Sequence, residues 1–134
     1  MSPSPVESIT ARIPARAEFV HVLRAVAASA AARMNLSVDS IEDLRLSVDE
    51  ACAQLLKAVP SGSRLTLSIR RTGLDVEVVV NGDGDPGPWP PDGNERTLAW
   101  QVLSGLSDEV TFERSASGPA VRIRTRAVIE ELSR

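Results

Sequence analysis

Two polar residues, Glu50 and Gln54, are the first candidates for chemistry in this sequence. They lie in the segment "IEDLRLSVDEACAQLLKA", where apolar residues recur at helical spacing, so a separation of four places both side chains on one helix face. That face points away from the apolar stripe. A carboxylate there can accept a proton from a substrate hydroxyl, and an amide one turn on can ligate a metal ion or meet phosphate oxygens. The same pattern is also typical of an ordinary solvated helix face.

A second candidate site is the stretch "VVVNGDGDPG", which runs from an apolar strand directly into glycines and acids. Its candidate ligand-binding residues are Asn81, Asp83 and Gly84. Glycine lets the backbone approach a ligand closely because it has no Cβ atom. Loops of this composition hold nucleotides or metal ions, but they also serve as plain connections, and the residues alone leave both interpretations open.

The sequence lacks the motifs of several other kinds of catalytic site. The sequence contains no Walker A motif, no Cys/His spacing typical of zinc sites and no Ser-His-Asp set. The only cysteine, Cys52, falls on the apolar stripe of its helix and is predicted to be a core residue.

Four residues are candidates for contact with a protein partner. Arg16, His21 and Arg24 lie on the expected exposed side of the first helix, where a solvated role is the ordinary alternative. Trp89 lies in a proline-rich loop, and exposed tryptophans often anchor interfaces. Its alternative role is to pack down onto the protein itself.

The helices and strands that position these residues are predicted from the spacing of apolar residues and from the proline and glycine residues that end several of them. Residues 1–7 are predicted to be a flexible tail, and residues 8–134 a single domain. Asn94 is predicted to cap the third helix. The pattern predicts, in order, a strand at 9–13, a helix from 16 or 17 to 35, a helix at 38–59 capped by Ser37, strands at 64–70 and 74–80, a loop at 81–93, a helix at 95–106 and strands at 109–115 and 120–126. This order predicts an α/β fold, a two-layer sandwich with a mixed, mostly antiparallel sheet and helices on one face.

The core "DLRLSVDEAC", with the helices around it, resembles the anti-sigma-factor serine kinases of the RsbW and SpoIIAB type, which belong to the GHKL group of ATPases and kinases. The resemblance covers about residues 8–126. It implies the histidine-kinase-ATPase-like fold of that group. The family helix carries an E-x-x-x-N box, so the resemblance implies that Glu50 takes the place of the general base and Gln54 that of the magnesium-binding asparagine. The longer glutamine displaces its oxygen, and Mg²⁺ demands near-ideal octahedral geometry.

The family's two other nucleotide boxes are also altered here. Its D-x-G-x-G loop, whose aspartate accepts a hydrogen bond from adenine, corresponds to a segment in which Asn81 replaces the aspartate while Asp83 and Asp85 replace the glycines. Shifting the register by two starts the motif at Asp83, with Gly87 as its only matching glycine. The glycine turn that holds phosphate corresponds to "NERTLAWQVL", where Glu95 adds charge of the wrong sign. Three altered boxes predict that neither ATP nor Mg²⁺ is bound tightly.

The resemblance implies as partners a sigma factor and an anti-sigma-factor antagonist of the STAS type, and it also implies a homodimer. Sequestering a sigma factor needs only a binding surface. Two alternatives remain: an active ATP-dependent serine kinase that phosphorylates the antagonist, and a nucleotide-free adaptor for another partner.

The net charge of −3 gives no basic footprint for direct contact with nucleic acid. No apolar run approaches the ~20 residues of a membrane span. A single cysteine fits a cytoplasmic location.

Overall fold

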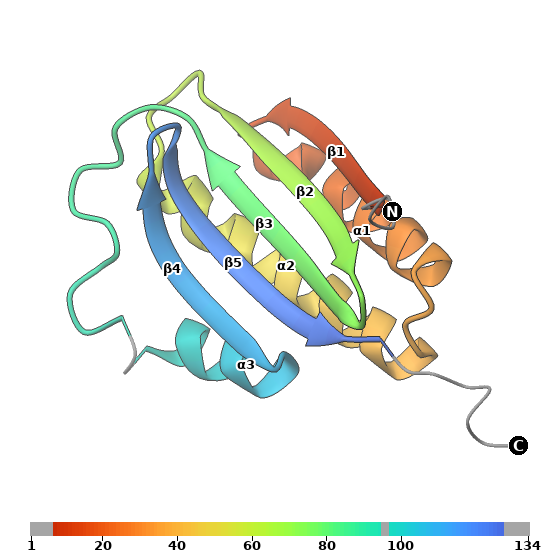
Figure 1. Ribbon diagram of the computed structural model, residues 1–134. Helices are drawn as coiled ribbons and strands as arrows, with labels where there is room; N and C mark the ends of the chain where they lie inside the picture. The colour runs from red at the N-terminus through yellow and green to blue at the C-terminus, as the bar shows by residue number, and fades with distance from the viewer. Residues whose placement is uncertain (1–6, 95–96, 128–134) are drawn as a thin grey trace, which may run out of the picture.

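The computed structural model describes residues 7–94 and 97–127. Its strands and helices run in the order that the sequence predicts (Figure 1). They are β1 (Glu7–Pro14), the 3-10 turn η1 (Ala17–Phe19), α1 (Val20–Arg33), α2 (Val38–Ala58), β2 (Arg64–Thr72), β3 (Asp75–Gly82), α3 (Leu98–Leu106), β4 (Glu109–Ser115) and β5 (Gly118–Arg126). Residue 7, expected in the flexible tail, opens β1, and the rest of that tail lies outside the described residues.

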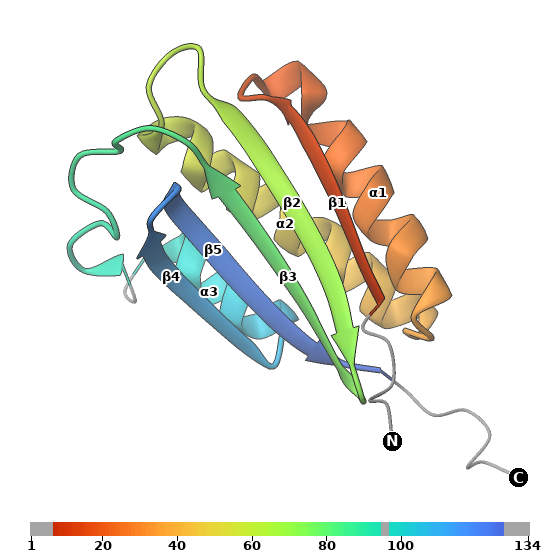
Figure 2. The same cartoon turned by 45° about the horizontal axis from the view of Figure 1, so that its top comes forward.

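The five strands form one sheet in the order β1-β2-β3-β5-β4, and every pairing between them is antiparallel. The three α-helices cover one face of this sheet, with α2 between α1 and α3, and the views in Figures 1 and 2 show the other face uncovered by any helix. The predicted two-layer α/β sandwich with helices on one face is therefore confirmed, but the sheet is entirely antiparallel and not mixed. No helix in the described ranges combines the length and apolar composition needed to cross a membrane.

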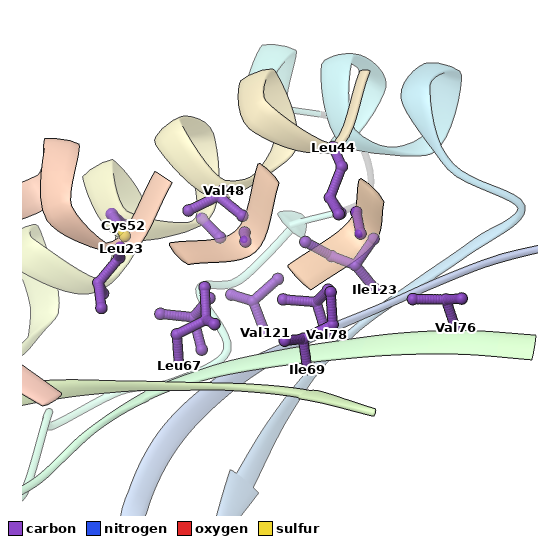
Figure 3. Packing of buried hydrophobic residues seen from close by; sticks show 14 of the residues in the cluster. Leu23, Leu44, Val48, Cys52, Leu67, Ile69, Val76, Val78, Val121 and Ile123 are labelled. Carbon is purple, nitrogen blue, oxygen red and sulfur yellow. The ribbon is translucent and has the colours of Figure 1, made fainter. Parts of the chain in front are cut away.

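The core lies between α2 and the inner face of the sheet (Figure 3). Ser37 caps α2 by accepting a hydrogen bond from the Ser40 backbone N–H at 3.1 Å, as the sequence predicts. Leu44, Val48 and Cys52 project from α2 toward alternate residues of the strands, such as Leu67 and Val78. Burial raises the pKa of the Cys52 thiol to about 12, so this cysteine is an inert core residue as predicted.

The outer face of the sheet is held by ion pairs that centre on Arg122. Its guanidinium donates to both carboxylate oxygens of Glu113, at 2.9 and 3.0 Å, and to Glu77 at 2.8 Å. Arg124 of β5 forms an ion pair with Glu109 of β4. The arginines of the last strand therefore find their acidic partners within the sheet.

The start of α3 differs from the prediction. Asn94 is not its N-cap; the side chain of Thr97 accepts a hydrogen bond from the backbone N–H of Trp100 at 3.1 Å, and α3 begins at Leu98. A capping side chain must reach the third backbone N–H of the helix, and Thr97 holds that position relative to Trp100. Residues 95 and 96, with the expected charge of Glu95, lie outside the described part of the chain.

Replacing Glu113 with Gln tests the outer network. Hydrogen bonding to Arg122 lowers the pKa of Glu113. A carboxyl group with a lowered pKa stabilises the fold above its unfolded-state value of about 4.3 and loses that contribution as the pH falls through the folded-state value. We expect the wild type to lose more unfolding free energy on acidification than E113Q, by up to about 1 kcal/mol, in urea titrations from about pH 6 to 3. Identical losses would contradict this account.

Candidate functional site

Glu50 and Gln54 lie side by side on α2, and they interact with each other. The Gln54 Nε2 atom donates a hydrogen bond to Glu50 Oε2 at 2.8 Å, and both side chains are half-buried. The spacing predicts this shared face correctly. The amide and the carboxylate thereby satisfy part of each other's hydrogen-bonding capacity without any ligand.

Glu50 opens into a groove of about 690 Å³ between α2 and α3. The α2 wall carries Glu50 with Leu46 and Ala53, and the α3 wall carries Val102 and Leu106. Sequence reasoning missed the α3 wall. The signal for it was an apolar residue, Val102, on a helix face that the core does not use.

Asn81 lies on the opposite side of the sheet from α2. Along β3 the side chains alternate, so that Val78 and Val80 are buried under the helices while Asn81 faces outward. Its Nδ2 atom donates to the Ser117 hydroxyl at 3.4 Å. Asn81 therefore does not share a face of the sheet with Glu50 and Gln54 of α2.

Gly82 holds the inward position at the end of β3. It is buried, and a Cβ atom added to it would lie 2.3 Å from Cγ1 of Val59, just after α2. Val59 therefore occupies the space that any side chain at position 82 would need.

The acids of the glycine-rich loop are engaged within the protein. Asp83 Oδ1 accepts from the backbone N–H of Arg64 at 2.8 Å, and Oδ2 accepts from its Nε at 3.3 Å. The backbone hydrogen bond from Arg64 lowers the pKa of Asp83, as the one from Gly87 does for Asp85. Gly84 adopts a φ of 88°, which favours glycine at this turn. The contacts of this loop are those of a connection that leads from β3 toward α3.

Trp89 is 6% exposed, so the hypothesis that it anchors a partner from the surface is wrong. Its ring stacks on Phe112 of β4 with centroids 5.3 Å apart, and its Nε1 donates to the Glu113 carbonyl oxygen at 3.0 Å. Trp100 contacts the same phenylalanine at 5.8 Å. Burying the large apolar ring while pairing its one N–H stabilises the loop against β4.

The partner-binding candidates of the first helix differ in their solvent exposure and in the partners that they contact within the protein. Arg24 donates to both carboxylate oxygens of Asp49 on α2, at 3.0 and 2.8 Å. Arg16 is exposed, pairs with Glu18 and lies 5.5 Å from the Phe19 ring centroid. His21 is exposed, and its Nδ1 atom donates to the Glu18 carbonyl oxygen at 3.0 Å. Arg16 and His21 are therefore the accessible members of this set, while Arg24 ties α1 to α2.

Known proteins place the chain in a family. A family model described as the histidine kinase-like ATPase domain matches residues 13–125. A serine-protein kinase RsbW of Bacillus velezensis is 31% identical over 134 aligned positions, covering 87% of this chain and 83% of that relative. This chain is a member of the RsbW-type histidine kinase-like ATPase family.

Two further proteins are similar to this chain. The RsbW of Bacillus thuringiensis strain Al Hakam is 39% identical over 51 residues, which cover 38% of this chain and 32% of that protein. A crystal structure of the RsbU and RsbW domains of Rv1364c from Mycobacterium tuberculosis superposes with a TM-score of 0.64 at 16% identity. That match covers 93% of this chain and 33% of the mycobacterial chain, and it shows the fold alone.

The residues of this RsbW-type domain do not fit the nucleotide and magnesium ion that the family name implies. The amide of Gln54 is bonded to Glu50, Asn81 faces the wrong side of the sheet, and Val59 fills the space beside Gly82. Within residues 7–94 and 97–127, no cluster of three or more His, Cys, Asp or Glu side chains is arranged to hold a metal ion.

Substitution of Gly82 tests the close packing against Val59. We expect Gly82→Ala to lower the free energy of unfolding by about 1–3 kcal/mol, because the added methyl overpacks the contact. Gly82→Asp is expected to destabilise further without creating ATP binding. The control is Gly105→Ala in α3, where a new Cβ meets no atom within 4 Å and helix propensity favours alanine by about 1 kcal/mol. A stable Gly82→Asp variant that binds ATP in calorimetry would contradict this interpretation.

Proposed function

We propose that this RsbW-type protein is a cytoplasmic anti-sigma factor that acts by binding. It sequesters a sigma factor from RNA polymerase and releases it when an antagonist of the STAS type competes. The observation that supports this proposal is that the chain keeps the family fold while Val59 leaves no free space for a side chain beside Gly82, at the end of β3. Sequestration requires a protein surface and no bound nucleotide.

Energetics favour binding over nucleotide chemistry. A good polar interaction lost from a buried site costs about 1–3 kcal/mol. The adenine-binding aspartate and the magnesium-binding asparagine are both replaced, and Val59 adds a steric obstacle. A micromolar site is worth about 8 kcal/mol in total. Losses of this number and size remove most of that affinity.

The N-terminal part of α1, with the turn before it, is the surface we assign to the sigma factor. Arg16 and His21 are exposed there, and Arg24 stands half-buried between α1 and α2. The ion pair between Arg24 and Asp49 holds the two helices in register at this place. An acidic or polar patch on the partner complements this surface.

A second candidate function is the active serine kinase, with Glu50 as general base. It is favoured by the half-buried position of Glu50 in an open groove and by the Bacillus velezensis relative, which is named a serine-protein kinase. In this alternative Glu50 accepts the hydroxyl proton of a serine on the antagonist. The two functions differ in whether ATP is bound.

Calorimetry with ATP and MgCl₂ separates them. We expect a dissociation constant weaker than about 10 µM, which corresponds to less than about 7 kcal/mol of binding free energy. A radiolabelled-phosphate assay with the antagonist is expected to give no transfer above the Glu50→Ala background. Tight ATP binding together with transfer that Glu50→Ala abolishes would establish the kinase and overturn the proposal.

Binding to purified sigma factors of the source bacterium tests the anti-sigma role. We expect one of them to bind the wild-type protein in the absence of ATP. Arg16→Ala and His21→Ala should each weaken that complex by about five- to tenfold, because each removes a contact worth about 1 kcal/mol. Arg33→Ala, an exposed change in the last turn of the same helix, is the matched control and should alter affinity less than twofold. The absence of binding to every sigma factor would refute the proposed function.

A further inference from the structure

The groove between α2 and α3 is an apolar surface that no described element of the chain covers. Leu46 on α2 is 54% exposed and Val102 on α3 is 37% exposed. The α2 wall also carries Ala53, which is exposed, and the α3 wall carries Leu106, which is half-buried. Apolar side chains gathered around one hollow mark a binding surface more often than scattered ones do.

The charges beside this surface are negative. The groove is bordered by the carboxylates of Asp49 and Glu50, and no described residue that lines it is basic. Asp49 is neutralised by Arg24, but the partner of Glu50 is the uncharged amide of Gln54. Glu50 therefore contributes one uncompensated negative charge, half-buried among apolar groups. A cation placed there gains more than it would in open water.

The shape of the groove favours a helical segment of a partner. Two helices form the walls, and the ridges of a third helix fit the groove between two others. The nine residues of α3 span about 13 Å at ~1.5 Å per residue, which matches two to three turns of an incoming helix. The small side chain of Ala53 lets the backbone of such a helix come close. No strand edge lines the groove, so an extended peptide would find no backbone partners there.

We propose that this groove binds a basic amphipathic helix of the protein partner, with apolar residues seated between Leu46 and Val102 and a Lys or Arg paired with Glu50. This inference rests on the proposed function, since it names the kind of partner segment that the anti-sigma factor holds. It gives Glu50 a role as an electrostatic anchor in place of a general base. Recognition then follows the helix-in-groove mode, with affinity from the apolar contacts and orientation from the charge pair.

A probe of defined chemistry tests the groove directly. A synthetic amphipathic helix of Leu and Lys, and its counterpart of Leu and Glu, are titrated into the ¹⁵N-labelled full-length protein. We expect the Leu/Lys peptide to shift the amide signals of Leu46, Glu50 and Val102, and the Leu/Glu peptide to leave them unchanged. No shift at these residues, or equal shifts with both peptides, would overturn the proposal.

Substitutions make the test specific. We expect Ala53→Arg, which fills the groove from an exposed position, to weaken Leu/Lys binding by about tenfold or more, and Glu50→Gln by about fivefold. Leu98→Arg, on the same helix as Val102 but outside the groove and 76% exposed, is the matched control and should change affinity less than about twofold. Thermal unfolding of each variant establishes that it is folded.

Binding of a sigma factor provides the second part of the test. If a sigma factor binds the wild type and the Ala53→Arg variant equally, the groove proposal fails while the anti-sigma function stands. If no sigma factor binds but the Leu/Lys helix occupies the groove and Ala53→Arg releases it, the anti-sigma function fails and the groove remains the site for a basic helix. Loss of both partners in Ala53→Arg, with Leu98→Arg unaffected, supports both.

Discussion

The alternation of side chains along β3 is the constraint on which the rest of the structure depends. It sends Val76, Val78 and Val80 under the helices, where they meet α2 and complete the core. The same alternation sends Asn81 outward and leaves position 82 facing Val59. A side chain at position 82 would have to displace Val59, so the alternation along β3 affects both the packing of the sheet and the surroundings of the end of this strand.

The two faces of the sheet are therefore stabilised in different ways. The inner face is apolar and buried by three helices, whereas the outer face is stabilised by ion pairs between neighbouring strands. Arg122 joins β5 to β3 and to β4 through Glu77 and Glu113. An uncovered sheet face needs such cross-strand pairs, because it has no second layer to pack against.

Helix α2 also has two sides, and its outer side carries the residues of α2 that the functional proposals involve. Its inner stripe holds the core, while Asp49 reaches α1 through Arg24 and Glu50 faces the groove toward α3. A carboxylate that stands in an apolar groove is suited to attract a basic partner. The chain keeps the family fold, and on this side of the helix the residue bonded to Glu50 is Gln54.

The sequence alone determined the element order, the faces of the helices and the two-layer architecture, because these follow from local periodicity and turn residues. It also placed Glu50 beside Gln54, since four residues make one helical turn. It could not determine which face Asn81 takes or that Trp89 is buried, because pleat register and aromatic packing depend on residues far apart in the chain. The contact between Gly82 and Val59 and the groove between α2 and α3 join segments that are separated by tens of residues. Only the tertiary structure brings those segments together, so only it decided which residues lie around the candidate site.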